Sequence, residues 1–577
     1  MIRRALIPCT RALALLLPAT LALAASSASR PAAPVDRVDL LAMTRIRDEG
    51  LNRSKVMDTA SQICDAHGPR LTGSPNYKRA AVWAKKQLAD WGLANAHLES
   101  FAPFGRGWSY ERATLRMLAP IDAAIPVIPR AWTPGTAGVV KGQAIKAKLE
   151  KDEDLEKWKG KLTGKLVLAD DVPEIKPHDK ADAHRHTDDE LDKLAQFEVG
   201  ARGRYEGDRD RGRKEYQFRK KLMKWLEEEK PLAMLSTTAR ADDGTIFVQG
   251  GGARKVGEPI GPPWLAVGAE GYGRIARLLD RKVDVELELE VAGRFHDEDP
   301  DACSNVVAEI PGTDKKLADE VVVIGAHYDS WHGGTGATDN GAGSAVVMEA
   351  MRILKAIDAR PRRTVRVVLW GGEEQGLLGS RDYVSKHYAS RPEPQEPEER
   401  EMPSYLRRRQ NTGPLTFKPE HAKVAAYFNL DNGTGRVRGV YCQENAAVVP
   451  IFEEWLQPFR DLGATTVTMR RTGGTDHLSF DAVGLPGFQF LQDDLDYETR
   501  THHSNVDTYE RLQKADLAQA SVLMAAFAYN AAMRDEMLPR KPIPPDPPAL
   551  PEKDEQKPRE EKKPDTKPEE KAKPVAP

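Results

Sequence analysis

Residues 321–354 read VVVIGAHYDSWHGGTGATDNGAGSAVVMEAMRIL. The apolar run at 321–326 has the length and continuity of a strand that is buried on both faces. Residues 341–354 follow with the apolar spacing of a helix, after a short Gly-rich turn. A buried strand followed by a helix is the repeating unit of a fold with a parallel sheet, so this stretch predicts an α/β domain.

The same alternation continues towards the C-terminus. Further strands are predicted at 364–370, 424–430 and 488–491. Helices are predicted at 377–387, 448–462 and 512–532. We therefore expect a mostly parallel central sheet flanked by helices.

Five side chains that could bind metal ions lie in short, unusual sequence contexts in this half of the chain. They are His327, Asp339, Glu374, Asp431 and His503. Three of them follow predicted strands, and the carboxyl ends of parallel strands meet at one edge of a sheet. Two imidazoles and three carboxylates suit zinc or a similar first-row ion. The sequence thus predicts a metal centre at that edge.

Asp339 and the adjacent pair Glu373-Glu374 indicate which residues would bind two ions and which would accept a proton. Two ions in one site lie ~3.5–4 Å apart and share a carboxylate, and Asp339, in a tight Gly-rich turn, is the predicted bridge. Neighbouring side chains of an extended segment point apart, so one glutamate can ligate while the other takes a proton from water. Asp329 is predicted to accept the second ring N–H of His327.

Two further histidines are open to more than one interpretation. His477 follows a Gly-Gly turn, and we expect it in the pocket within reach of an oxyanion, with a structural role as the alternative. His502 is adjacent to His503 and competes with it for the ligand role.

The first half of the chain has a different character. Residues 25–109 carry helical patterns and are predicted to belong to the α/β domain, whose main part is 269–536. Residues 110–268 contain short β-like runs between Gly and Pro turns, for example 165–168 and 245–248, which predicts a separate, mainly β domain.

Three segments are rich in charge or proline. The stretch at about 172–230 is predicted to form a solvated helical hairpin or excursion. Its histidines, His178, His184 and His186, fit a polar surface, with metal binding as the alternative. Residues 391–412 are predicted to be an exposed insertion, and the Pro/Glu/Lys tail at 537–577 is predicted to be disordered.

The N-terminus predicts export. A positively charged start precedes an apolar run at 12–23, which is too short to span a bilayer as a helix. The small-x-small sequence at 22–24 predicts cleavage of a signal peptide over 1–24. We expect a secreted or periplasmic bacterial protein with no membrane span after cleavage. The net charge of −2 gives no indication of a nucleic-acid partner.

The cysteines of the mature chain do not form a recognisable framework. Cys64, Cys303 and Cys442 are widely spaced and lack a CxxC pair. Neither a disulfide scaffold nor a cysteine zinc site is predicted.

Residues from 305 to about 512 resemble the catalytic domain of the M28 family of co-catalytic zinc exopeptidases. The motifs AHYDS, ATDNGAGS, WGGEEQGLLGS, NLDN and HHSNVDT occur in the family order. The resemblance implies a phosphorylase/hydrolase-like fold and two zinc ions, or other first-row divalent ions. The β domain resembles the protease-associated (PA) domain inserted in some members, and HGPRLTGSPNY at 67–77 resembles the start of the carboxypeptidase Q-like group.

The resemblance also implies a role for each candidate. Glu373 is the implied general base, and Asp339 is the implied bridge, often with a cis peptide after it. His503 is preferred to His502 because it lies four positions before Asp507. The implied ligands are His327, Asp339 and Asp431 for one ion and Asp339, Glu374 and His503 for the other.

We expect a metallo-exopeptidase that hydrolyses peptide bonds near a chain terminus. Aminopeptidase action is predicted first, with carboxypeptidase or dipeptidase action as the alternative. Two hypotheses from other classes are a glutaminyl cyclase-like acyltransferase with one zinc and a receptor-like binding protein. The complete set of ligands and base argues against both. No decisive acid for an α-amine or arginine for a carboxylate is visible, so the sequence leaves the substrate terminus open.

Overall fold

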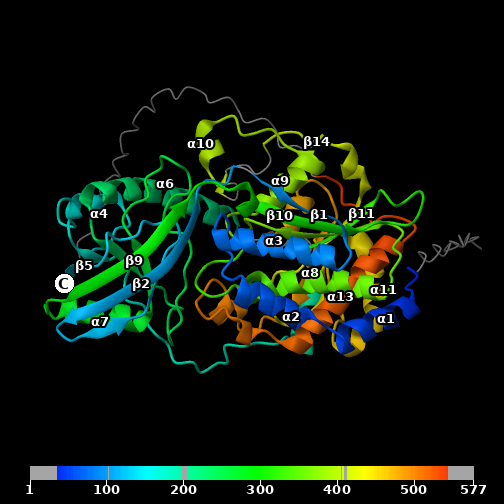
Figure 1. Cartoon of the computed structure of the whole chain (residues 1–577), viewed down its shortest axis with the longest axis horizontal. Helices are drawn as coiled ribbons and strands as arrows, with labels where there is room; N and C mark the ends of the chain where they lie inside the picture. Colours follow the sequence, from blue (N-terminus) through cyan, green and yellow to red (C-terminus); the bar gives the residue numbers. More distant parts are fainter. Residues whose placement is uncertain (1–35, 102, 198–204, 404–405, 408–411, 544–577) are drawn as a thin grey trace, which may run out of the picture.

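The computed structural model describes residues 36–101, 103–197, 205–403, 406–407 and 412–543. The chain forms two α/β bodies, each built on an eight-stranded sheet (Figure 1). The larger body combines the N-terminal helices with the C-terminal half of the chain, and the smaller body, the second domain, spans 107–296. The predicted signal peptide at 1–24 and the tail from 544 onward lie outside the described residues.

The central sheet of the larger body has the strand order β1-β10-β12-β11-β15-β18-β16-β17. In this order the strands are Ala94–Ser100, Ser304–Ile310, Thr364–Trp370, Val321–His327, Val424–Asn429, Gly487–Gln492, Val437–Tyr441 and Thr466–Thr468. The four middle strands, β12 to β18, are parallel as predicted. Antiparallel pairs flank them on both sides, so the whole sheet is mixed. The antiparallel strand β10 is followed by the connection 311–320 to β11, which is too short for a crossover helix.

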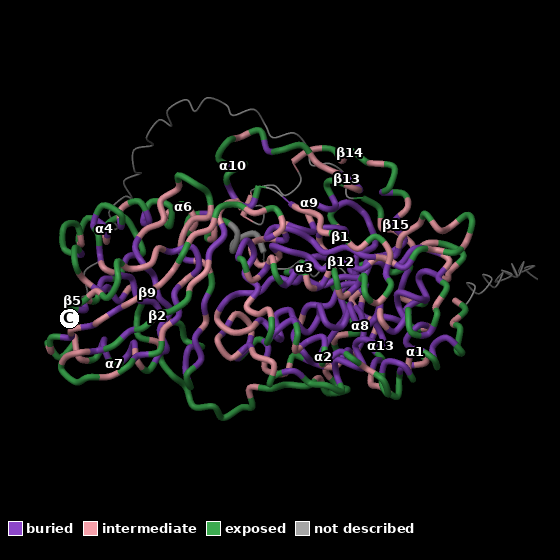
Figure 2. Tube along the Cα trace, in the orientation of Figure 1, coloured by how far each residue is buried: buried purple, intermediate pink, exposed green. Residues whose placement is uncertain are grey.

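Helices cover both faces of this sheet. One face carries α1 (Leu40–Asn52), α2 (Val56–Ser61), α3 (Pro75–Asp90), α8 (Ala342–Ala356), α11 (Val449–Leu456) and α13 (Lys514–Met533). The other carries α9 (Leu378–His387) and α12 (His477–Asp481). Along β12, Val367 and Leu369 enter the first core, whereas Val368 and Trp370 enter the second. The sheet is therefore buried on both faces, as the continuous apolar strands predicted (Figure 2).

The second domain has the strand order β3-β2-β9-β5-β6-β7-β8-β4. In this order the strands are Ala123–Ile125, Gly107–Ala119, Glu286–His296, Val140–Lys146, Leu166–Leu168, Ala233–Ser236, Trp264–Val267 and Val127–Pro129. Helices α4 (Asp152–Trp158), α6 (Tyr205–Glu229) and α7 (Ala269–Asp280) accompany them, so the domain is α/β rather than mainly β.

The predicted boundary of this domain at 268 was placed too early. Strand β9 pairs with β2 over the full length of both strands, and it buries Leu287, Leu289 and Val291 between outward-facing glutamates. That alternation is the pattern of a half-buried strand. The predicted run at 245–248 is not a strand of this sheet, and Phe247 instead bridges to Ser504 of the larger body.

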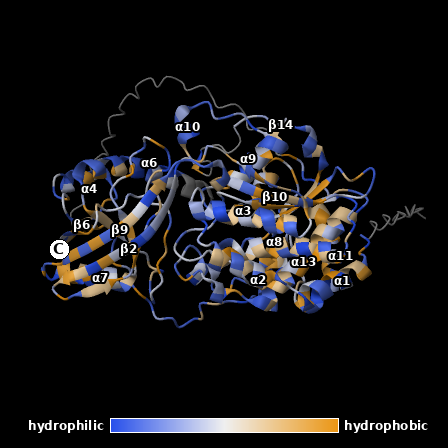
Figure 3. Cartoon of the chain, viewed as in Figure 1, coloured by the Kyte–Doolittle hydropathy of each residue, from blue (hydrophilic) through white to orange (hydrophobic). Residues whose placement is uncertain are grey.

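In its described residues, 172–197 and 205–230, the charged excursion forms two helices that pack against different bodies. Helix α5 (Asp188–Ala195) contacts β17 of the larger body, whereas Leu222 and Leu226 of α6 are buried in the second domain. The insertion predicted to be exposed carries α10 (Pro397–Glu401), and its Glu399 forms a buried ion pair with Arg213 of α6. Figure 3 shows α10 as mostly hydrophilic and the central sheet as mostly hydrophobic. The two insertions therefore contact each other.

Cysteine pairing and membrane insertion can be assessed for the described part of the chain. Cys64, Cys303 and Cys442 are buried free thiols there. None of the helices in that part combines the length and the apolar character that crossing a membrane requires.

Candidate metal centre

The five predicted ligands come together at one edge of the central sheet. His327 ends β11, Glu374 lies just beyond β12, and Asp431 follows β15. Asp339 lies in the turn before α8, and His503 lies in the loop that follows β18. Because β12, β11 and β15 are adjacent and parallel, their carboxyl ends meet at this edge.

Asp339 lies between two histidines. Its Oδ1 is 3.2 Å from Nε2 of His327, and its Oδ2 is 3.3 Å from Nε2 of His503. Asp431 Oδ1 is 3.1 Å from the same atom of His327, and Glu374 Oε2 is 3.0 Å from that of His503. The side chains thus form two triplets that share Asp339. The peptide bond between Asp339 and Asn340 is cis, as the family resemblance implied.

The electrostatics of the centre are dominated by buried acids. Burial raises the pKa of Glu373 and that of Glu374 well above the ordinary range. At His327 burial acts to lower the pKa, but the charges of Asp431 and Glu373 outweigh it and raise that pKa. Burial opposes ionisation of Asp339, yet the hydrogen bond to His327 and the charge of His503 bring its pKa below the usual range. Such a concentration of buried carboxylates needs cations nearby.

The donor set fits first-row metal ions. Zinc bonds of ~2.0–2.2 Å in a tetrahedral arrangement place neighbouring ligand atoms about 3.3–3.6 Å apart. The separations around Asp339, between 3.0 and 3.3 Å, are close to that spacing. In addition, Oε1 of Glu374 is buried and has no hydrogen-bond partner among the described residues. Imidazole nitrogen and carboxylate oxygen are ordinary ligands of zinc.

Asp329 contacts His327 through its main-chain oxygen rather than through the carboxylate that was predicted to do so. The Nδ1 atom of His327 lies 3.0 Å from the main-chain oxygen of Asp329, whereas the nearer carboxylate oxygen is 3.6 Å away. The carboxylate instead accepts hydrogen bonds from the backbone N–H groups of Glu373 and Glu374 and from the hydroxyl of Thr72. Asp329 therefore orients both His327 and the turn that carries the two glutamates.

Asp507 performs a similar function for the turn that carries Asp339. Its carboxylate accepts hydrogen bonds from the backbone N–H and the hydroxyl of Thr338, at 2.6 and 2.8 Å. It also accepts one from the backbone N–H of Asp339. Burial raises the pKa of Asp507 to about 7.

The second domain contributes directly to the surroundings of His503. The side-chain nitrogen of Gln249 lies 2.8 Å from Nδ1 of His503, and the backbone N–H of Val248 donates to the His503 oxygen. Nε2 of the competing His502 is 3.9 Å from Asp339 Oδ2, farther than that of His503. Gln249 was missed by the sequence analysis because nothing in its local context points to a contact with a distant domain.

His477 is buried, and one of its ring nitrogens already has polar neighbours. Its Nε2 lies 2.7 Å from the side-chain nitrogen of Gln443 and 3.2 Å from the oxygen of Thr472, and burial lowers its pKa to about 4. Its neighbour Asp476 was not predicted to matter, yet both of its carboxylate oxygens are buried without partners among the described residues. Burial raises the pKa of Asp476 to about 7, and the charges of His327 and Asp431 act on it.

Tyr497 is a second residue that the sequence analysis missed. Its side chain is buried among the charges of Asp339, Asp431 and Glu374, and its ring lies 4.8 Å from that of His502. Burial raises the pKa of its phenol well above the ordinary value, so the hydroxyl remains protonated and can donate.

Comparison with known proteins adds to this geometry. Residues 305–528 match the model of peptidase family M28. Residues 305–528 therefore form an M28 peptidase domain. Carboxypeptidase Q of Mus musculus is 26% identical over 497 residues, which cover 85% of this chain and 88% of that protein. Aminopeptidase YwaD of Bacillus subtilis is 27% identical over 38% of this chain and 42% of its own length.

Solved structures show the same fold. A peptidase M28 precursor from Shewanella amazonensis has a TM-score of 0.60 at 24% identity, covering 87% of this chain and 98% of its own. A zinc aminopeptidase from Bacillus subtilis has a TM-score of 0.51 at 18% identity and covers 83% and 95%. The comparisons confirm the predicted family. The M28 chain described here is a zinc metallopeptidase.

Proposed function

We propose that this M28 peptidase is an exopeptidase with two zinc ions held around Asp339. His327 and Asp431 complete one set of ligands, and Glu374 and His503 complete the other. The observation that supports this best is that Asp339 presents Oδ1 to His327 and Oδ2 to His503, at 3.2 and 3.3 Å. A carboxylate with one oxygen towards each triplet is suited to bridging two ions.

Glu373 is proposed as the general base. Bound zinc supplies Lewis acidity, which polarises the scissile carbonyl and lowers the pKa of water towards ~7. Glu373 is half-buried beside the ligands but belongs to neither triplet, so its carboxylate is free to take the proton from water and pass it to the leaving amine. Asp329 holds this side chain in place through the backbone N–H of Glu373.

Tyr497 is proposed to donate to the developing oxyanion. Its hydroxyl is the protonated donor beside Asp339, whereas Nε2 of His477 is already engaged by Gln443 and Thr472. The pocket role that the sequence suggested for His477 therefore passes to Tyr497. A preorganised donor aimed at a developing negative charge contributes substantially to catalysis.

The enzyme is proposed to cleave at one of the two ends of a peptide substrate. Aminopeptidase action is the first candidate, in keeping with the sequence prediction and with the match to aminopeptidase YwaD. Carboxypeptidase action is the second, because the match to carboxypeptidase Q covers 88% of that protein and therefore extends well beyond the catalytic residues. The predicted signal peptide at 1–24 supports a location outside the cytoplasm for either activity.

One short peptide in three forms distinguishes the candidates. With zinc-loaded protein, an aminopeptidase cleaves the free and C-amidated forms but not the N-acetylated form. A carboxypeptidase cleaves the free and N-acetylated forms but not the amidated form. A dipeptidase acts only on two-residue substrates with both ends free. Products are identified by mass.

Metal analysis of the same preparation tests the number of ions. Two zinc ions per chain at the centre, both lost in Asp339→Ala, are expected. One zinc ion together with cyclisation of an N-terminal glutamine would favour the acyltransferase hypothesis and contradict the proposal.

A further inference from the structure

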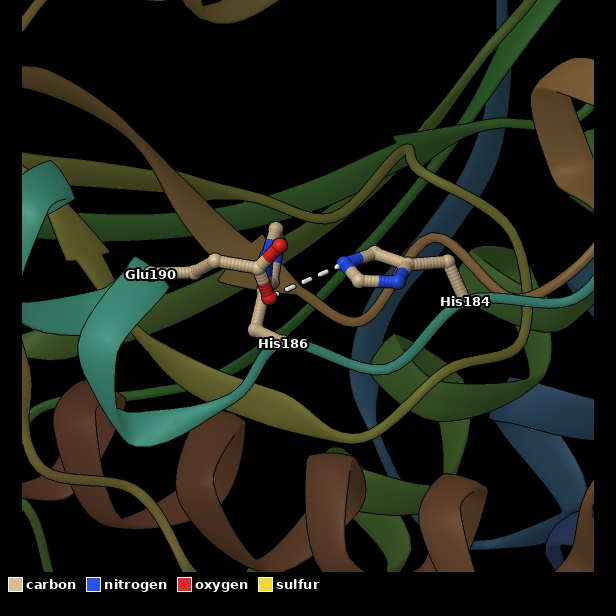
Figure 4. A group of neighbouring side chains, drawn as sticks. All are labelled: His184, His186 and Glu190. Atoms are coloured by element: carbon tan, nitrogen blue, oxygen red, sulfur yellow. Dashed lines mark ion pairs between the residues drawn. The ribbon is translucent and has the colours of Figure 1, made fainter.

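We infer that the charged excursion carries a further metal site, separate from the catalytic centre, formed by His184, His186 and Glu190. Each of these residues offers one ligand atom, and the three atoms lie within 4.8 Å of one another. Figure 4 shows the Glu190 carboxylate directed towards the His184 ring, with the His186 side chain beside it. Nε2 of His184 is 3.2 Å from Oε2 of Glu190, and the two imidazole rings lie 5.5 Å apart.

The backbone fixes the alternation of these side chains. His184 forms an antiparallel bridge with Leu495, through main-chain hydrogen bonds of 3.0 and 2.8 Å. In extended backbone, residues i and i+2 lie on one side and residue i+1 on the other. Arg185 accordingly forms ion pairs with Asp493 and Asp516, both buried, on the other side. The two histidines are therefore held side by side by contacts that do not involve their rings.

Glu190 is also fixed by its position. It is the third residue of α5, and its Oε2 accepts hydrogen bonds from the backbone N–H and the hydroxyl of Thr187. This capping arrangement directs the carboxylate back over the start of the helix, where the histidines lie. The adjacent Asp494 interacts electrostatically with both imidazoles.

Two imidazoles and a carboxylate favour a borderline first-row ion such as zinc over magnesium or calcium, which prefer oxygen ligands. Zinc needs ligand atoms about 3.3–3.6 Å apart. The side chain of His184 is 45% exposed, so its ring can rotate to close the remaining gap while Glu190 keeps its capping hydrogen bonds, and water has access to a fourth position.

An ion at this site would fasten the excursion to the loop that leads to the catalytic centre. The excursion already contacts that loop through the His184–Leu495 bridge and through the ion pair between Asp182 and Arg500. The loop continues directly into His502 and His503. Zinc binding is therefore expected to stabilise this junction.

Site-resolved chemical labelling of histidines tests the inference. The full-length protein is treated with diethylpyrocarbonate with and without added zinc, and modification of each histidine is measured by peptide mass spectrometry. At zinc about tenfold above its dissociation constant, about a tenth of the sites are free, so labelling of His184 and His186 should fall about tenfold. Magnesium at the same concentration should give no protection.

His97 provides a matched reference. Its side chain is 51% exposed and lies 3.9 Å from Glu99, whose other carboxylate oxygen is 2.8 Å from His387. Unlike His184, His186 and Glu190, these three residues do not form a group of ligand atoms within 4.8 Å of one another among the described residues. Labelling of His97 should be insensitive to zinc, and His97→Ala should leave the protection of His184 unchanged.

Two variants decide whether the three residues act together. His186→Ala and Glu190→Gln should each abolish most of the zinc protection of His184, while the main-chain bridge to Leu495 keeps the segment in place. Glutamine can still cap α5, so Glu190→Gln keeps the fold. Equal labelling of His184 with and without zinc in the unmodified chain, or protection that persists in both variants, would overturn the inference.

Discussion

The two histidine–carboxylate clusters of this protein differ in burial, and that difference determines how each can be recognised and tested. Around Asp339, the side chains of His327, Glu374 and Asp431 are all at least nine-tenths buried. The cluster around His184 is open to water. Buried carboxylates without cations are costly, whereas exposed ones are solvated. We therefore expect the buried cluster to depend on metal for its stability, and the proposed exposed site not to depend on it.

Removal of metal should have the largest effect, because it should destabilise the buried cluster but not the exposed one. Burial raises the pKa values of Asp476 and Asp507 from an ordinary value near 3.8 to about 7 in the metal-free protein. The folded state then binds more protons than the unfolded state over this range, so stability falls as pH rises from about 4 to about 7. For one fully buried carboxyl group, a pKa that moves from near 3.8 in the unfolded state to about 7 in the folded state changes the free energy of unfolding by about 4 kcal/mol.

The measurement is the thermal unfolding midpoint as a function of pH, with chelator and with zinc. The chelated protein should lose stability steeply between pH 5 and 7, whereas the zinc-loaded protein should show a flatter profile because bound cations stabilise the ionised carboxylates. Identical profiles with and without chelator would show that the buried cluster does not depend on metal.

Glu373→Gln separates catalysis from metal binding within the buried cluster. Glutamine cannot accept the proton, so kcat should fall by about 10²–10⁴, while two zinc ions remain bound because Glu373 belongs to neither triplet. Peptide turnover and metal content are measured on the same sample. Near-normal turnover would remove Glu373 from the role of general base. The control is Glu498→Gln, an exposed acid near His502, which should leave turnover unchanged.

The buried cluster was predictable from the sequence because its members follow the ends of buried strands. The apolar runs before His327, Glu374 and Asp431 specify parallel strands, and parallel strands bring their carboxyl ends together. Asp339 and His503 lie outside strands. Asp339 was predicted as the bridge from its tight Gly-rich turn, and the resemblance to the M28 family decided for His503 over the adjacent His502.

What surrounds the ligands was less predictable. Gln249 reaches His503 from another domain, and its role depends on how two domains dock, which no local pattern encodes. The strand β9 was overlooked although its alternation was present in the sequence, and the boundary of the second domain was misplaced as a result. Asp476 owes its raised pKa to burial, which a Gly-rich, polar stretch of sequence does not indicate.

Gln249→Ala measures how much the second domain contributes to the buried cluster. Loss of a partner to the non-ligating nitrogen of a metal-bound histidine typically costs about 10–100-fold in metal affinity or activity. We expect an effect of that size on zinc affinity and on kcat/KM, with the fold retained because Val248 still bonds to the main chain of His503. Gln217→Ala, which removes an exposed contact to Glu398, is the control and should change neither quantity. An effect on stability alone would make Gln249 a packing residue.

The smallest effect is expected for the exposed cluster in the absence of zinc. The ion pair between His184 and Glu190 is solvated on both sides, and exposed pairs contribute little to stability. Glu190→Gln should therefore leave the urea midpoint of the chelated protein unchanged, and the difference between variant and unmodified chain should appear only when zinc is added. A clear loss of stability in the chelated variant would show that Glu190 acts mainly through the cap of α5. Because glutamine can satisfy the same Thr187 groups, an unchanged midpoint together with lost zinc protection assigns the carboxylate to the ion rather than to the helix.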